Sequence, residues 1–257
     1  MAAMDDTTIT AIGARRSDTA GVAPVEARGL TKHYGAVVAV DSLSFSLRRG
    51  TITGFLGPNG AGKTTTLRML LGLARPTAGE ALIFGRPYRQ LDRPTRSVGA
   101  VLESSDFDPD RSGRNHLRAL ALASGIGDDR LDDLLELVEL THAADRPVRT
   151  YSLGMRQRLG LAAALLGDPD LLLLDEPANG LDAAGVHWLR GFLRTFAAQG
   201  KTVLVSSHIL AEVAQTVDEV LIIGQGRLVA EIRMDELDGI GRSLEDLYLE
   251  LTAGRAA

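Results

Sequence analysis

The 257-residue sequence predicts an α/β fold in which a helical lobe is inserted into a mainly parallel sheet. The apolar runs Leu171–Leu174, Val203–Val205 and Val220–Ile223 are continuous and separated by helix-length segments, which is typical of parallel strands buried on both faces. A further apolar run, Ile52–Leu56, leads through a glycine-rich loop into a helix-like segment. Residues 104–165 then change to a helical pattern before the strands resume.

The N-terminal part is expected to hold a mobile tail followed by antiparallel strands. Residues 1–23 are rich in Ala, Thr, Asp and Gly without periodicity, and the main domain is expected over 24–232. Val25–Leu30 should begin the first strand, and Ala81–Phe84 should form a short one. Ser42–Leu47 alternates apolar and polar residues, as a half-buried antiparallel strand does. An antiparallel β subdomain beside the parallel sheet is therefore predicted.

Helical patterns fill the inserted lobe of about residues 104–165. Helices are expected at Asn115–Ser124, Arg130–Leu140 and Leu153–Gly167. The second of them has apolar residues on one face, as a helix packed against a core requires: Leu131, Leu134, Leu135 and Val138.

The C-terminal part begins with a predicted hairpin. Gly224-Gln225-Gly226 is expected to turn the preceding strand into Arg227–Ile232. Residues 233–257 are expected as a helical extension. Its short amphipathic helix is indicated by four apolar or aromatic residues at helical spacing, Leu244, Leu247, Tyr248 and Leu251.

Composition excludes several classes of function. The net charge is −5, which gives no basic face and argues against nucleic acid as the main partner. No cysteine is present, so disulfides and thiolate metal sites are excluded. No apolar run reaches the roughly 18 residues needed to span a bilayer, and the N-terminus lacks the apolar region of a signal peptide. Lys201, Arg48 and Arg49 are expected on the solvated surface.

The glycine-rich loop after Ile52–Leu56 matches the P-loop pattern G-x-x-x-x-G-K-[ST]. Its glycines permit close backbone approaches, and their N–H groups with the next helix N-terminus form a nest for phosphate oxygens. Lys63 is expected to face the β- and γ-phosphates, and the Thr64 hydroxyl to ligate Mg²⁺. The expected ATP-binding residues of the loop are Gly57, Pro58, Asn59, Gly60, Ala61, Gly62, Lys63, Thr64 and Thr65.

A second nucleotide element ends the strand Leu171–Leu174, where Asp175 and Glu176 follow. Acids at the carboxyl edge of a parallel sheet lie beside the phosphate loop. Asp175 is expected to hold Mg²⁺ through water, and Glu176 to polarise the attacking water as general base. An apolar strand that ends in Asp-Glu is common by itself. Because a P-loop precedes it in this chain, the pair indicates a nucleotide site.

Together with these elements, four further motifs resemble the ATP-binding cassette (ABC) ATPases over residues 25–232. Tyr151–Arg158 is similar to the signature motif, Asn179–Asp182 to the D-loop, His208 to the switch histidine and Tyr34 to the aromatic that stacks on adenine. The resemblance implies a RecA-like P-loop NTPase core with an antiparallel β subdomain and an inserted α-helical subdomain. It also implies that ATP joins two copies of the chain head to tail.

The signature-like segment keeps Ser152 and Gly154, which in the family contact the γ-phosphate bound by the other subunit. It departs from the usual Leu-Ser-Gly-Gly-Gln, since Leu153 replaces the first glycine and Met155 the glutamine. ATP sandwiching is expected to survive both changes. The alternative for Ser152 is an ordinary helix N-cap.

Three further residues have alternatives of the same kind. Glu103 stands where the family usually has a glutamine near Mg²⁺ and the attacking water, as in some exporters of peptide antibiotics; otherwise it is a surface glutamate. His208 is expected to bond the γ-phosphate and orient Glu176, or else to be a structural histidine. Tyr34 stacks on adenine or is a turn aromatic.

The resemblance implies an ATP-hydrolysing subunit that powers a separate membrane permease, within the drug, antibiotic and lipid exporter group. Its cofactors would be ATP and Mg²⁺, its partners the permease and a second copy of itself, and its place the cytoplasmic face of the membrane. Two alternatives stay open: a soluble ABC ATPase that acts on nucleic acid or ribosomes, and a regulatory cassette that binds ATP without turnover.

Overall fold

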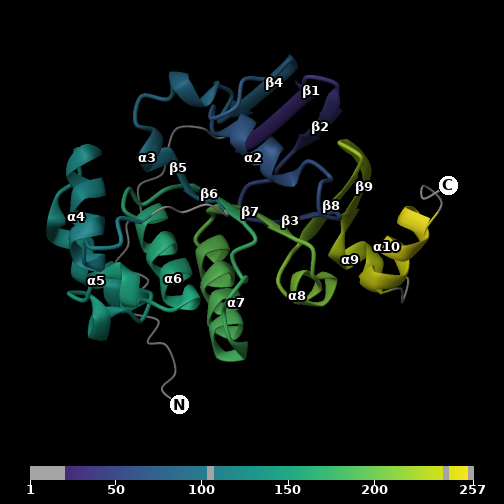
Figure 1. Ribbon diagram of the computed structural model, residues 1–257. Coiled ribbons are helices and arrows are strands. Elements are labelled where there is room, and N and C mark those ends of the chain that lie inside the picture. Colours follow the sequence, from purple (N-terminus) through teal and green to yellow (C-terminus); the bar gives the residue numbers. More distant parts are fainter. Residues whose placement is uncertain (1–20, 103–106, 240–242, 254–257) are drawn as a thin grey trace.

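The computed structural model describes residues 21–102, 107–239 and 243–253, and its core is a six-stranded sheet (Figure 1). The strand order is β5-β6-β7-β3-β8-β9, with all pairs parallel except the β8–β9 hairpin. The predicted parallel sheet and the hairpin are both observed. The strands are β3 (Ile52–Leu56), β5 (Val98–Val101), β6 (Leu171–Asp175), β7 (Thr202–Ser207), β8 (Glu219–Gly224) and β9 (Arg227–Arg233).

A separate three-stranded antiparallel sheet has the order β2-β1-β4. Its strands are β1 (Val25–Tyr34), β2 (Val37–Ser46) and β4 (Ala78–Ile83). The antiparallel prediction is correct, but β1 and β2 are longer than their sequence patterns indicate. Register shifts along the β1–β2 pair interrupt the alternation of buried and exposed residues, so the period of two covers only part of each strand.

The helices form layers on both faces of the larger sheet. Helix α2 lies between the two sheets, while α6, α7 and α8 lie on the opposite face (Figure 1). The lobe beyond them holds α4 and α5. The helices are α2 (Lys63–Leu70), α3 (Pro94–Ser97), α4 (Gly113–Ala123), α5 (Leu131–Leu137), α6 (Leu153–Ala164), α7 (Ala183–Ala198), α8 (Leu210–Ala214), α9 (Met234–Gly239) and α10 (Leu244–Ala253).

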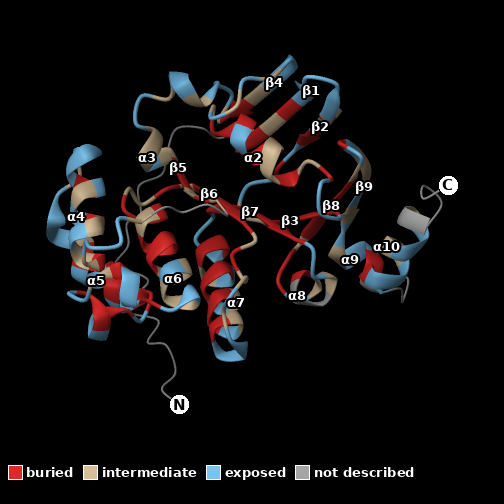
Figure 2. Cartoon of the chain, viewed as in Figure 1, coloured by how far each residue is buried: buried red, intermediate tan, exposed pale blue. Residues whose placement is uncertain are grey.

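Burial of both sheet faces explains the continuous apolar strands. Leu171 and Leu173 of β6 pack in one core cluster with α2 and the smaller sheet, whereas Leu172 and Leu174 pack in another with α6 and α7. Figure 2 shows the central strands β3, β6 and β7 buried along their length. Because each strand faces two layers, neither face carries the polar residues that would produce alternation.

Two features differ from the sequence expectations or are absent from them. Lys201 is buried, not solvated: its ammonium pairs with Asp168 and lies 5.1 Å from the Phe196 ring centroid. Helix α7 has no counterpart among the helices expected from the sequence, although its buried apolar residues recur at helical spacing. No helix within the described residues combines the length and hydropathy needed to cross a bilayer.

Candidate functional site

The P-loop joins β3 to α2 in a backbone path that only glycine allows at two positions. Gly62 has φ +103° at the N-cap of α2, and a Cβ there would lie 2.5 Å from the Ala39 carbonyl oxygen. A Cβ on Gly57 would lie 2.4 Å from the Ile223 carbonyl oxygen. The loop is thus packed against β2 and β8, and it leads directly into the first turn of α2.

Lys63 is the buried cation of this loop. Its side chain is 7% exposed, and Nζ donates a hydrogen bond to the Gly57 carbonyl at 2.6 Å. The same Nζ lies 3.7 Å from Glu176 Oε1. The neighbouring Thr64 and Thr65 are half-buried on the first turn of α2, whereas Pro58, Asn59 and Gly60 form the exposed tip. A phosphate on the loop would therefore meet one ammonium and several N–H groups.

Asp175 ends β6 with its carboxylate almost fully buried. Its Oδ1 accepts a hydrogen bond from the Ser206 hydroxyl at 2.5 Å, and its Oδ2 is buried without a partner. A buried carboxylate oxygen left unpaired is costly unless a cation meets it. Among the described residues, no three His, Cys, Asp or Glu side chains form a metal-binding group. The single carboxylate of Asp175 fits Mg²⁺, which usually binds through one or two carboxylates and completes its coordination with water and substrate phosphates.

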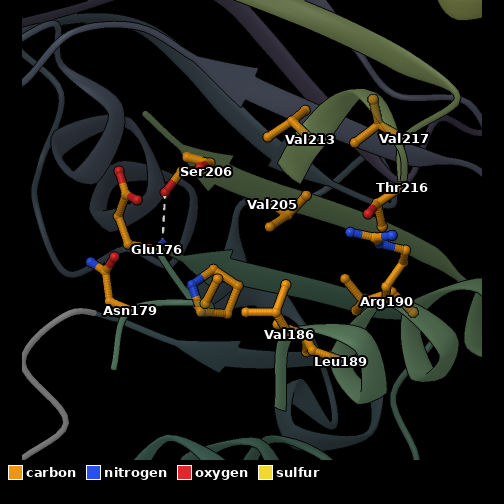
Figure 3. A pocket seen from close by; sticks show the side chains of 14 residues that line it. Glu176, Asn179, Val186, Leu189, Arg190, Val205, Ser206, Val213, Thr216 and Val217 are labelled. Atoms are coloured by element: carbon orange, nitrogen blue, oxygen red, sulfur yellow. Dashed lines mark hydrogen bonds between the residues drawn. The ribbon is translucent and has the colours of Figure 1, made fainter. Parts of the chain in front are cut away.

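Glu176 lies at the centre of the polar cluster. Its Oε2 is 2.9 Å from His208 Nδ1, and its side chain is 11% exposed. Glu176 has φ +50°, a left-handed conformation that costs a non-glycine residue about 1–3 kcal/mol. The Ser206 hydroxyl accepts a hydrogen bond from its N–H at 3.0 Å (Figure 3). The backbone turn thus aims the carboxylate toward Lys63 and His208.

An apolar cavity of about 40 Å³ lies behind Glu176, between β7, α7 and α8 (Figure 3). Its walls include Val186, Leu189, Val205 and Val213. The cavity volume is well below the roughly 150 Å³ of an engineered cavity that binds benzene, so the pocket is too small for a nucleotide. The carboxylate of Glu176 lies on the side that faces Lys63 and His208.

Ser152, Gly154 and Tyr34 stand apart from this cluster. Ser152 caps α6, with Oγ accepting from the Met155 N–H at 3.2 Å. The Tyr34 ring is exposed and carries Lys32 Nζ 4.8 Å above it. Within the described residues, no hydrogen bond or ion pair connects Ser152, Gly154 or Tyr34 to the Lys63–Glu176–His208 cluster. Glu103, an expected Mg²⁺ contact, lies outside the described residues.

Ser206 is the residue that the sequence did not assign. It precedes His208 by two positions and is the register partner of Asp175 in the β6–β7 pair. A polar residue at the end of an otherwise apolar strand was the available signal. Its partner was hidden because pairing between distant strands is not visible in the local pattern.

Known proteins that are similar in sequence identify the family of this chain. Residues 40–179 match the family described as ABC transporter. The chain belongs to the ABC transporter family. It is 44% identical over 229 residues to the bacitracin transport ATP-binding protein BcrA of Bacillus licheniformis, covering 88% of this chain and 74% of the relative. It is 42% identical over 227 residues to the Nod factor export ATP-binding protein I of Ralstonia nicotianae, covering 86% and 71%.

The chain also shares its fold with solved structures. An ATP-binding subunit of an ABC transporter is 31% identical, with a TM-score of 0.79, and the match covers 89% of this chain and 99% of that one. A dimeric cassette bound to ADP and phosphate shares the fold at 22% identity and a TM-score of 0.75, covering 82% and 98%. The chain is therefore an ATP-binding and ATP-hydrolysing subunit that powers a separate permease. The alternative of a soluble ABC ATPase acting on nucleic acid or ribosomes finds no support among these relatives.

Proposed function

We propose that the chain hydrolyses ATP with Mg²⁺ at residues 57–65, Asp175, Glu176 and His208, and so drives an exporter of drugs, antibiotics or lipids. The observation that carries this proposal is the cluster in which Glu176 approaches both Lys63 and His208. A cation can hold phosphate and a carboxylate can take a proton from water, and an imidazole beside that carboxylate can orient it, so the cluster is suited to phosphoryl transfer to water.

The cluster residues divide the work of phosphate binding, proton transfer and orientation in this proposal. Lys63 holds the β- and γ-phosphates, while Glu176 accepts a proton as the water oxygen attacks the γ-phosphorus and the bond to the β–γ bridging oxygen breaks. His208 holds the γ-phosphate and orients the Glu176 carboxylate. Thr64 and Asp175 would hold Mg²⁺, which when bound neutralises charge on the phosphate oxygens. The Tyr34 ring would stack on adenine.

The signature residues support a composite site made by two copies of the chain. Ser152 and Gly154 begin α6, whose N-terminus attracts anions, yet neither bonds to the described cluster of its own copy. We infer that they contact the γ-phosphate held by a second copy in a two-fold ATP-sandwich dimer. The fold shared with a dimeric cassette is consistent with this arrangement.

Export as the direction rests on relatives named for bacitracin transport and Nod factor export. In this proposal the subunit is cytoplasmic and peripheral at the inner face of the cell membrane.

The domain limits 24–232 and 233–257, with a helical subdomain at about 104–165, belong to the same proposal. The proposal also includes Glu103 as a residue that contacts Mg²⁺ or the attacking water and senses the permease. A Glu103→Gln variant should therefore bind ATP normally but change transport.

Co-purification tests this function. A tagged chain should bring down a multi-helix membrane protein from its host, and inside-out vesicles with both proteins should take up cargo only with Mg²⁺ and ATP. Lys63→Ala should keep the membrane partner but abolish uptake and ATPase activity. A vanadate-sensitive ATPase that is never found at a membrane would refute the transport role.

A further inference from the structure

Ser206 lies in the middle of the larger sheet, directly opposite Asp175. Strand β7 runs between β6 and β3, and Ser206 pairs in register with Asp175 on one side and Phe55 on the other. Its residue is 0% exposed. Register partners on neighbouring strands carry their side chains on the same face. The hydroxyl is therefore positioned against the Asp175 carboxylate by the sheet itself.

One hydroxyl makes two directional contacts. Ser206 Oγ donates to Asp175 Oδ1 at 2.5 Å and accepts from the Glu176 N–H at 3.0 Å. A hydroxyl has a single proton to donate and lone pairs to accept. With that proton committed to Asp175, the lone pairs remain for Glu176. The short distance is that of a charge-assisted hydrogen bond.

These contacts control two groups at once. Because Oδ1 of Asp175 is occupied, Oδ2 is the oxygen left buried and unpaired. The Glu176 N–H, at a residue with φ +50°, donates both to the Ser206 hydroxyl at 3.0 Å and to the Ser206 carbonyl oxygen at 3.3 Å. We propose that Ser206 is a positioning residue: its hydroxyl presents a single Asp175 oxygen to the catalytic cation and adds a second acceptor to the backbone bond that holds the N–H of Glu176. This inference rests on the function proposed above.

The adjacent Ser207 offers a matched control. Its hydroxyl accepts a hydrogen bond from the Ile209 N–H at 3.0 Å, and it too is buried. No described hydrogen bond links its side chain to Asp175 or Glu176. Ser207→Ala thus removes a buried hydroxyl from the same strand without touching either carboxylate. Ser206→Thr keeps the hydroxyl, while Ser206→Cys keeps nearly the same volume but only a weak donor.

The experiment measures metal binding apart from turnover. Mn²⁺ serves as the probe, titrated into protein with ADP and followed by electron paramagnetic resonance. Ser206→Ala and Ser206→Cys should weaken Mn²⁺ binding about 10- to 100-fold, the effect of losing a hydrogen bond to a charged group. Their kcat should fall at least as far, while metal-free binding of trinitrophenyl-ATP should stay within about twofold of wild type. Ser206→Thr and Ser207→Ala should resemble wild type in all three measurements.

Thermal unfolding of each variant separates folding from positioning. If Ser206→Ala does not fold, the near-isosteric Ser206→Cys decides the outcome. Wild-type Mn²⁺ affinity in a folded Ser206→Ala or Ser206→Cys would overturn the proposal, as would equal losses in Ser207→Ala. If the wild-type protein with ADP binds no Mn²⁺, the proposed function fails first, which distinguishes the two failures.

Discussion

Replacing Glu176 by Gln tests the chemistry most sharply. The side chain is 11% exposed, with Oε2 2.9 Å from His208 Nδ1 and Oε1 3.7 Å from Lys63 Nζ. Glutamine keeps the shape but cannot take a proton from water. General-base catalysis contributes about 10²- to 10⁴-fold, which corresponds to about 3–5 kcal/mol of the barrier. The kcat of Glu176→Gln should fall by that factor.

The same substitution should favour ATP binding. It removes a negative charge beside Lys63 and the expected γ-phosphate, so ATP should bind at least as tightly as in wild type and hold the dimer closed. Phosphate release measures kcat, and light scattering with ATP measures the dimer. Glu80→Gln is the control, because Glu80 is 64% exposed and, among the described residues, its ion pair is with Arg28 on the smaller sheet. Equal hydrolysis by wild type and Glu176→Gln would refute the assignment of the base.

Three further predictions follow from the same geometry. His208→Ala should lower single-turnover hydrolysis about tenfold or more with little change in ATP affinity; an unchanged rate would make His208 a structural residue. Tyr34→Ala should weaken ATP binding about 3- to 10-fold in calorimetry while Tyr34→Phe binds normally; equal affinities would leave Tyr34 a turn aromatic. Gly62→Ala should abolish nucleotide binding, because its Cβ would meet the Ala39 carbonyl oxygen at 2.5 Å; wild-type affinity would contradict the P-loop geometry.

The parts of the fold that local patterns encode could be predicted from the sequence. Leu171–Leu174 is apolar at every position because alternate residues enter two different cores, and this predicts a parallel sheet. The P-loop could be predicted as a motif because its residues are neighbours in the chain, whereas Asp175–Glu176 was interpretable only together with that earlier loop. The approach of Glu176 to Lys63 and His208 follows from the parallel order of β6, β7 and β3.

The features that the sequence left open depend on distant partners. Lys201 is charged and was expected in solvent, but Asp168 and the Phe196 ring cover it in the fold. Ser206 gains its role only when β7 lies beside β6, since its two contacts are made across the sheet. The N-cap bond from Met155 to Ser152 fits both interpretations of Ser152, because a phosphate contact would come from a second copy of the chain.

Mixing two inactive variants tests the composite site directly. Lys63→Ala removes the P-loop cation, whereas Ser152→Asp keeps a good N-cap on α6 but sets a carboxylate against the γ-phosphate. Random pairing makes half of the dimers mixed, each with one intact site, so an equal mixture should regain about a quarter of wild-type ATPase activity. Each variant alone should remain inactive. A mixture as inactive as its components, with mixed dimers present, would contradict an ATP site shared between two copies.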